Sequence, residues 1–526
     1  MKTRVNTSNR LISGAFSLTL STIIVKLLGL IYKIPLSNIL GDEGMGYFNS
    51  AYTVYAFFYL ICTAGVPKAV TILVTEAKAK GRAAEESAIV RVAMVAFLSL
   101  GALFTVALAA LANPLAELIG NSKSAATMIA IAPSIVIVSL AGVVRGYLGA
   151  DMRLLDIAVS QVIEGVGKLA LGLVFAIYAS RKEFGLEMIS AMTILGVSVG
   201  ALLGLVYLFI CAKNLKKTEN VEQNFKIDTT RAKILGRILS ISIPITLSAA
   251  VMSMTNLIDL GLIMRGLLSL GYTESEASAL YGNYTTLAVP MFNLVIAVIT
   301  PISIAFTPVF ARAGVEGNGL LLSDSLNMAM RLTSVVSAPM LVGMMVFSEE
   351  ILSLLFSNSE IGAGAVLLCL LAPAILFASL LTVVNSALEA GGQVRAPIVS
   401  MLLGGGCKIL VSYLLISNVE FGIGGAPLGT VICYAVALIS SIIIYTSRSE
   451  ARISIISTML VPYLSAAFAI IAARLLYDRV FLQFSGLISL CLAIFSAALI
   501  YAIFLVISGT LRPDILQKTA KYTKTV

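Results

Sequence analysis

The sequence contains no histidine and no tryptophan, and only 12% of its residues are charged. The lack of histidine removes the commonest side chain for proton relays and metal binding. None of the six cysteines has CxxC spacing, which argues against a metal site and against a disulfide framework. A glycine-rich phosphate-binding motif ending in GKS or GKT is also missing, so no nucleotide-driven motor is indicated. We therefore expect neither a metal nor a cofactor, and leave a coupling cation open.

Apolar residues dominate what is present. The chain has 526 residues, of which 59% are hydrophobic, and its mean hydropathy is +0.99. A soluble globular chain carries about twice this share of charge. Apolar runs of about 20 residues, the length that crosses a bilayer as a helix, recur along the whole sequence. The sequence therefore predicts an all-α polytopic membrane protein.

The apolar runs predict fourteen transmembrane helices. The first run is too long for the core of a cleaved signal peptide, so we interpret it as a span. Prolines inside several spans are tolerated where neighbouring helices satisfy the freed backbone groups. The predicted spans are 11–34, 47–74, 87–112, 125–147, 156–179, 187–211, 234–268, 280–310, 324–347, 362–388, 396–417, 424–446, 454–476 and 484–508.

The basic loop residues set the orientation. Lysine and arginine outnumber aspartate and glutamate, 36 to 27, but most of this excess falls in loops on one side. With the N-terminus inside, the outer loops hold only Lys123, Arg181, Lys182 and Arg479. By the positive-inside rule, both termini are cytoplasmic. This asymmetry explains the basic excess without a nucleic-acid partner.

The chain also carries an internal repeat. Residues 132–168 match residues 372–408 at a constant offset of 240 without a gap. Identical pairs include Pro133/Pro373, Gly165/Gly405 and Lys168/Lys408, besides many apolar positions. A matched proline, glycine and lysine in one register indicate a duplicated bundle, an arrangement typical of transporters.

The repeat divides the chain into lobes. The polar stretch 212–233 is predicted to be a cytoplasmic linker between an N-lobe, residues 1–211, and a C-lobe, residues 234–446. Residues 447–526 supply two further helices and a cytoplasmic tail. Because each copy has six helices, the predicted pseudo-twofold axis runs along the membrane normal, with a cavity where the lobes face each other.

Lysines inside the spans are the candidate binding residues. A lysine near the helix centre costs on the order of 3 kcal/mol to insert, so it usually faces a wet cavity or a partner. Lys26 and Lys33 are seven residues apart, which places both on one helix face at different depths. Such a ladder suits a diphosphate. The alternative is that Lys33 extends outward to the headgroups and Lys26 pairs with an acid.

The repeated lysines have candidate partners. Lys168 follows Glu164 by four residues, which favours a structural pair on the helix. The counterpart of Glu164 in the second copy is Gly404, so Lys408 lacks this option. We expect Lys408 to pair with Asp259, which lies at a similar depth in the seventh span.

The other membrane cations divide into two groups. Lys68 follows a proline that loosens the helix, and is predicted to face the cavity; Arg265 faces either the cavity or the headgroups. The remaining arginines lie near helix ends and are predicted to reach the headgroups: Arg91, Arg145, Arg237, Arg331 and Arg474.

Two N-terminal segments carry a family resemblance. "VKLLGLIYKIPLSNILGDEGMGYFNSAYTVY" and "TAGVPKAVTILVTEAKAKG" resemble the start of polysaccharide-type flippases of the multidrug/oligosaccharidyl-lipid/polysaccharide (MOP) exporter superfamily. The nearest branch is the stage V sporulation protein B type of Gram-positive bacteria, which is related to the lipid II flippases. The helix count, the duplication and the extra C-terminal pair of helices fit this family along the whole chain.

The resemblance implies two lobes that open alternately inward and outward around a cationic cavity. Lys26 matches a basic position in the first helix of lipid II flippases. Two further basic positions of that family fall at Tyr32, beside Lys33, and at Tyr59, with Lys68 further along. These departures count against lipid II itself as the cargo. Some relatives bind sodium through an acid on the seventh helix, which Asp259 matches.

The resulting hypothesis is a flippase of the bacterial cytoplasmic membrane with a lipid-linked, diphosphate-bearing glycan or peptidoglycan precursor as cargo. We expect a monomer that contacts membrane lipids and has no enzymatic activity. Two alternatives stay open. A cation-coupled multidrug antiporter shares the fold but favours carboxylates in its cavity. A membrane enzyme acting on lipid-linked sugar needs acid and base residues at a membrane face, commonly with a long outer loop.

Overall fold

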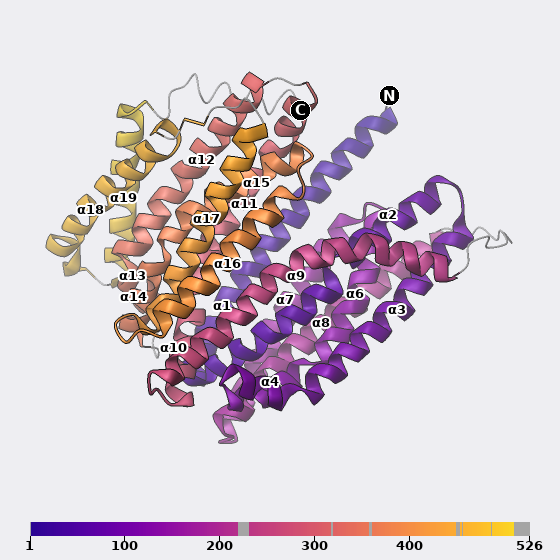
Figure 1. Cartoon of the computed structure of the whole chain (residues 1–526), viewed down its shortest axis with the longest axis horizontal. Coiled ribbons are helices and arrows are strands. Elements are labelled where there is room, and N and C mark those ends of the chain that lie inside the picture. Colours follow the sequence, from indigo (N-terminus) through magenta and orange to yellow (C-terminus); the bar gives the residue numbers. More distant parts are fainter. Residues whose placement is uncertain are drawn as a thin grey trace. The chain divides into compact units, whose positions relative to one another are not determined.

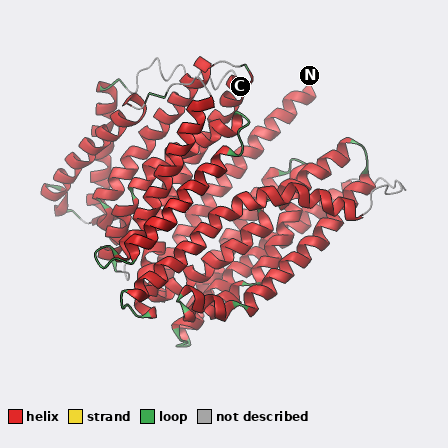
Figure 2. Ribbon diagram, in the orientation of Figure 1, coloured by secondary structure: helices red, strands yellow, loops and turns green. Residues whose placement is uncertain are grey.

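The structure of the protein is a computed structural model that describes residues 2–218, 231–316, 319–356, 360–448, 453–454, 456–484 and 486–509. Within these ranges every regular element is a helix, as Figure 2 shows. Helices satisfy all backbone hydrogen bonds within one segment, as the hydrocarbon core of a membrane requires. Most of the predicted linker, 219–230, and the tail, 510–526, lie outside the described residues.

The chain divides by contacts into two compact units (Figure 1). The first unit contains Met1–Leu268 and Tyr272–Gly282. Its helices are α1 Lys2–Thr63, α2 Val66–Ala79, α3 Ala83–Ala110, α4 Ala112–Ile119, η1 Ser122–Ser124, α5 Ala125–Ile131, α6 Pro133–Ala150, α7 Leu154–Arg181, α8 Leu186–Thr218, α9 Arg231–Ser269 and α10 Glu274–Asn283, the last two ending within one residue of the division.

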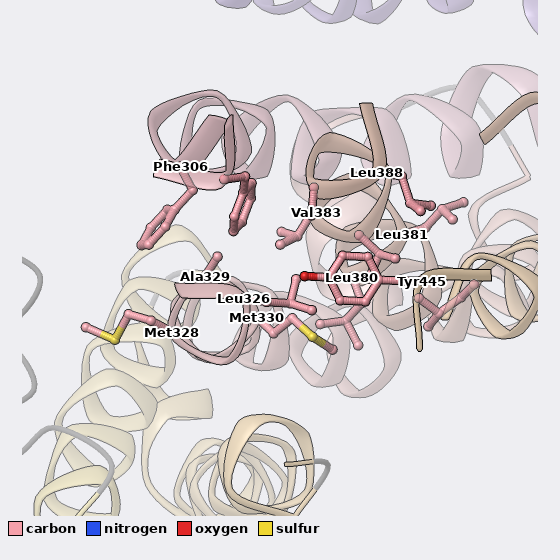
Figure 3. Packing of buried hydrophobic residues seen from close by; sticks show 14 of the residues in the cluster. Phe306, Leu326, Met328, Ala329, Met330, Leu380, Leu381, Val383, Leu388 and Tyr445 are labelled. Atoms are coloured by element: carbon pink, nitrogen blue, oxygen red, sulfur yellow. The ribbon is translucent and has the colours of Figure 1, made fainter. Parts of the chain in front are cut away.

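The second unit contains Ser269–Gly271 and Asn283–Val526. One of its cores joins α11, α12, α15 and α17, with side chains such as Leu326, Leu380 and Val383 fully buried (Figure 3). Its helices are η2 Tyr284–Ala288, α11 Val289–Val315, α12 Gly319–Val346, α13 Ser348–Leu355, α14 Ile361–Leu371, α15 Pro373–Ala390, α16 Ala396–Ile416, η3 Gly422–Gly424, α17 Gly425–Arg448, η4 Ile456–Leu460, α18 Val461–Arg479, η5 Phe481–Gln483 and α19 Gly486–Ile507.

The helices confirm the predicted polytopic architecture. Among the described residues, twelve are long and apolar enough to cross a membrane, and one of these, Leu20–Ala79, has 60 residues. That length is about three times the roughly 20 residues that one crossing needs, so the segment is long enough for the first two predicted spans. The 39-residue α9 covers the predicted seventh span. With these two assignments a described helix covers each of the fourteen predicted spans, and the number of membrane crossings stays a prediction.

The long first helix bends at a glycine. Gly41 has a φ of 62°, inside a segment that is otherwise helical. This left-handed conformation is strained for a residue with a Cβ, so glycine is the residue that permits the bend. The two halves of α1 are therefore separate elements that present different side chains to the rest of the first unit.

Close glycine contacts join α7 and α8. A Cβ on Gly196 would lie 2.4 Å from the Cα of Gly172, and one on Gly200 would lie 2.6 Å from the carbonyl oxygen of Glu164. Only residues without a side chain permit this approach, which is how helices commonly pack in membranes. The contact fixes the position of the α7 face that bears Glu164 and Lys168.

The internal repeat is visible in the backbone of each unit. Helices α6 and α15 begin at Pro133 and Pro373 and have 18 residues each, so their bounds differ by the same offset of 240. The turns that follow also correspond. The amide of Arg153 donates to the carbonyl of Leu148 over 3.1 Å, and that of Gln393 donates to Leu388 over 2.9 Å.

One position in this turn differs between the copies. Both turns require a left-handed residue, which is Met152 with a φ of 55° in the first copy and Gly392 with a φ of 80° in the second. The two units are defined by contacts, and contacts group α9 with the helices that precede it. The predicted lobes are defined by the repeat and place α9 in the C-lobe, so the lobe boundaries stay a prediction.

Candidate functional site

A cavity of about 350 Å³ lies within the first unit and is lined by both halves of α1 and by α6, α7 and α8. Lining residues recur at helical spacing, as on α7, where one face supplies four of them. The polar and aromatic lining residues are Thr22, Lys26, Tyr52, Tyr55, Tyr59, Arg145, Gln161, Glu164 and Lys168. The hydroxyl of Ser21 donates to Oε1 of Gln161 over 3.1 Å, which joins α1 to α7 beside the cavity.

Three cations and one carboxylate line this cavity. Lys26 comes from the first half of α1, Arg145 from α6, and Lys168 and Glu164 from α7. Lys26 is exposed, whereas the side chain of Arg145 is only 11% exposed. The lining therefore has a positive formal balance, which suits an anionic ligand.

The Arg145 guanidinium forms an ion pair with Glu164. Its Nη2 donates to Oε2 of Glu164 over 2.8 Å. Two predictions are therefore wrong. Arg145 does not extend to the headgroups, because the α7 carboxylate holds it inside the unit, and Glu164 pairs with Arg145 rather than with Lys168. The signal that could have identified Arg145 is its position within the repeat, one turn before the end of α6.

Tyrosine rings hold the Lys168 ammonium. Its Nζ lies 4.5 Å from the ring centroid of Tyr52 and 5.7 Å from that of Tyr32. Such cation–π contacts stabilise a lysine without neutralising it. Tyr52, Tyr55 and Tyr59 follow one face of α1, with centroids 5.8 Å apart at each step. The sequence prediction missed this tyrosine ladder, although its helical spacing is readable in the sequence.

The other predicted cargo-binding residues lie elsewhere. Lys33 is part-buried and its Nζ donates to Oδ1 of Asn49 over 3.3 Å, and it is not among the residues that line the cavity. Lys68 is exposed near the start of α2. Arg265 is exposed too, and its Nε donates to the carbonyl of Leu118 over 2.6 Å, which joins α9 to α4. The structure brings Lys26 and Lys168 into one cavity, and leaves the cargo-binding roles of all five residues as predictions.

Asp259 and Lys408 are both buried, with 7% of each residue exposed. Asp259 lies on α9 in the first unit, and Lys408 lies on α16 in the second. Their predicted pairing, or a cation at Asp259, stays a prediction. Across the described residues, no cluster of three or more cysteine, aspartate or glutamate side chains could hold a metal ion.

Two family models match the chain. A family model described as "Polysaccharide biosynthesis protein" matches residues 11–313, which is more than half of the chain. A second model, MatE, matches residues 284–414. The first match includes all the residues of the cavity described above.

Individual relatives cover nearly the whole chain. Stage V sporulation protein B of Bacillus subtilis (strain 168) is 24% identical over 517 residues, covering 96% of this chain and 97% of the relative. The lipid II flippase MurJ of the same organism is 24% identical over 489 residues, covering 88% of each chain.

A solved structure gives the same fold. The lipid II flippase MurJ in its inward closed conformation has a TM-score of 0.69 at 15% sequence identity, covering 93% of this chain and 98% of that one. At this identity the likeness concerns the fold alone. Together with the family match, it places the chain among multi-pass membrane proteins of known architecture. The chain belongs to the family whose model is described as "Polysaccharide biosynthesis protein".

Proposed function

We propose that the protein is a flippase that moves a lipid-linked glycan or peptidoglycan precursor, carried on a polyprenyl diphosphate, from the inner to the outer leaflet of the bacterial cytoplasmic membrane. The observation that carries the proposal is the cavity of the first unit, where Lys26, Arg145 and Lys168 gather against one carboxylate. The names of the relatives, a lipid II flippase and a sporulation protein, support a cell-envelope cargo.

The chemistry of the cargo explains why these cations are needed. A diphosphate cannot enter hydrocarbon alone, because burying an unpaired charge is prohibitive. Lysine binds phosphate as a point charge, and arginine adds two parallel hydrogen bonds. In the proposed bound state, phosphate oxygens approach the Lys26 and Lys168 ammonium groups first, since Arg145 is already paired with Glu164.

The tyrosine ladder gives the sugar a place beside the phosphates. Tyr52, Tyr55 and Tyr59 offer ring faces to the apolar faces of a sugar, and hydroxyl groups to its oxygens. Because Tyr52 also holds Lys168, the sugar site and the diphosphate site share one residue. The polyprenyl tail needs no site in this cavity, because it stays in the lipid.

Movement of the cargo needs a change of access and a source of free energy. Solved structures of a multidrug resistance MATE family transporter include an inward-facing and an outward-facing conformation, and we propose a similar alternation here, with both termini cytoplasmic throughout. A membrane potential supplies about 2.3 kcal/mol per charge per 100 mV. An inside-negative potential would therefore favour the return of the empty, positively charged cavity to its inward-open state. Consumption of the cargo on the outer side would also drive net movement from the inner to the outer leaflet, because it lowers the cargo concentration there.

Flipping by the purified protein in vesicles tests this proposal. A fluorescent polyprenyl-diphosphate disaccharide is placed in both leaflets, and an impermeant reductant reports how fast the inner pool reaches the outside. Wild-type protein should accelerate this exchange, whereas Lys26→Gln and Lys168→Gln should slow it. Equal rates for wild type, both variants and protein-free vesicles would contradict the proposal.

A multidrug antiporter is the second candidate, supported by the MatE match over residues 284–414. It requires a carboxylate free to bind a cationic drug, and in the cavity Glu164 is engaged by Arg145. Uptake of a fluorescent organic cation under a sodium or proton gradient, with no lipid flipping in the same vesicles, would favour this candidate.

A further inference from the structure

A second groove of the first unit, of about 550 Å³, lies between the N-terminal parts of α3 and α9. Arg91 and Ser87 from α3 and Arg231 from α9 are among its lining residues, together with apolar side chains such as Val95 and Leu235. Ser87 and Arg91 are four residues apart, so they share one face of α3. The groove thus joins two guanidinium groups and one hydroxyl to an apolar wall.

The walls of this groove are firmly positioned. Ile234 and Ile238 of α9 pack against Ile89, Ala93 and Phe97 of α3 in one buried cluster. The side chain of Arg237 also forms an ion pair with Glu76 at the end of α2. These contacts hold the two helices together beneath the groove while leaving Arg91 and Arg231 exposed.

Nearby carboxylates are engaged with other cations. Glu76 binds Lys80 as well as Arg237, Glu85 binds Arg82, and Glu86 binds Lys78. Across the described residues, neither Arg91 nor Arg231 forms an ion pair within 4.0 Å. Two arginines at one groove, with no counter-ion among the residues that the structure describes, favour an external anion.

An exposed apolar stripe continues from the two arginines. On α9 it runs through Leu239, Ile243 and Leu247, at intervals of four residues from Leu235. On α3 it continues with Val95, which is 61% exposed, and Leu98. The groove therefore has two arginines at one end and an apolar surface beyond them. This order matches a phospholipid, which has a charged headgroup followed by acyl chains.

We propose that the α3–α9 groove binds the headgroup of an anionic phospholipid. Its phosphate accepts hydrogen bonds from Arg91 and Arg231, and its acyl chains lie along the apolar stripe. Basic pockets between transmembrane helices bind acidic headgroups in this way. The positive-inside prediction places this groove in the cytoplasmic leaflet, where the lipid would brace α9 against α3 independently of the cargo cavity.

Native mass spectrometry of the full-length protein in a nonionic detergent tests the site with dioleoylphosphatidylglycerol as the probe. Each arginine near a lipid headgroup contributes about 1 kcal/mol, so Arg91→Gln/Arg231→Gln should weaken binding about thirtyfold. Arg91→Lys/Arg231→Lys should restore most of the affinity. The matched control, Arg181→Gln/Lys182→Gln, removes two exposed cations at the far end of α7 and should bind as the wild type does.

Two further probes separate the contribution of the headgroup charge from that of the acyl chains. Dioleoylphosphatidylcholine has the same chains with no net charge and should bind at least tenfold more weakly to the wild type. Glycerol phosphate, which has no acyl chains, should not compete at equal concentration. Unchanged phosphatidylglycerol binding by the double glutamine variant, or full competition by glycerol phosphate, would overturn the proposal. Because both arginines are exposed, single Arg91→Gln and Arg231→Gln variants provide the same test should the double variant fail to fold.

Discussion

The two copies of the repeat share a backbone and differ in their side chains. Helices α6 and α15 begin at matching prolines, have the same length and end in turns with matching hydrogen bonds. The first copy places Arg145, Glu164 and Lys168 around a cavity. At the corresponding positions the second copy has Asn385, Gly404 and Lys408.

Two of these three positions differ, and the second copy has a hydrogen bond and a close helix contact where the first copy has the Arg145–Glu164 ion pair. Oδ1 of Asn385 accepts a hydrogen bond from the Ser441 hydroxyl over 2.9 Å. A Cβ on Gly404 would lie 2.4 Å from the carbonyl oxygen of Cys433, so α16 and α17 are in contact where the first copy has a carboxylate. The two copies therefore share the backbone of α6 and α15 and differ in the polar side chains at matching positions.

The largest loss of stability is expected when the acid of the first copy, Glu164, is introduced at the matching position of the second copy, Gly404. Gly404→Glu should destabilise the protein by at least about 3 kcal/mol, because the side chain overpacks the α16–α17 contact and buries a charge. Thermal unfolding in detergent measures this loss. Gly404→Ala should be destabilising too, whereas Gly406→Ala, whose Cβ would meet nothing within 4 Å, should not be. Equal unfolding midpoints for these two alanine variants would contradict the packing argument.

Removing the arginine from the first copy should have the next largest effect. Arg145→Gln loses a charged hydrogen bond of about 1.5–3 kcal/mol, so flipping in vesicles should fall about 10- to 150-fold. Asn385→Ala changes the matching position of the second copy and should leave flipping per folded molecule unchanged. If the two substitutions slowed flipping equally, Arg145 would have no role in flipping beyond that of the matching residue in the second copy.

The repeated lysines sharpen the comparison further. Lys168→Gln removes an ammonium group from the cavity and should weaken binding of the lipid-linked diphosphate about tenfold, measured as an increase in the half-saturating cargo concentration. Lys168→Arg keeps the charge and should retain most of the affinity. A loss of maximal rate without a change in half-saturation would show that Lys168 does not bind the cargo directly.

The smallest predicted effect concerns the ring beneath Lys168. Tyr52→Leu removes a cation–π contact of about 1 kcal/mol, so cargo affinity should fall about fivefold. Tyr52→Phe keeps the ring and should change affinity less than twofold. A titration of the fluorescent cargo against both variants measures the difference, and an equal loss in both would assign the effect to the hydroxyl group instead.

The sequence predicted the fold well because two strong signals agreed. Apolar length located the helices, and the gap-free offset between Pro133 and Pro373 identified two helices, α6 and α15, whose bounds match. The bend at Gly41 was not predicted as part of a helix, since a single glycine between apolar runs reads equally well as a loop.

The site was predicted less completely, for a physical reason. The insertion cost of a lone lysine identified Lys26 and Lys168, because mid-span charges are rare. Arg145 lies near a helix end, where depth alone does not distinguish a cation that reaches the headgroups from one held by an acid. Its partner Glu164 is 19 residues away on another helix, and only the packing of α6 against α7 brings the two together.

The residue with a left-handed conformation in the turn after α6 is a position where a substitution should stabilise the folded protein. Met152 adopts a φ of 55° where the second copy uses glycine, and a side chain in that conformation costs roughly 1–2 kcal/mol. Met152→Gly would remove this strain, partly offset by the greater freedom of glycine in the unfolded chain. Since the residue is exposed and outside both cavities, the substitution would give crystallographers and spectroscopists a longer-lived sample whose transport properties are those of the parent.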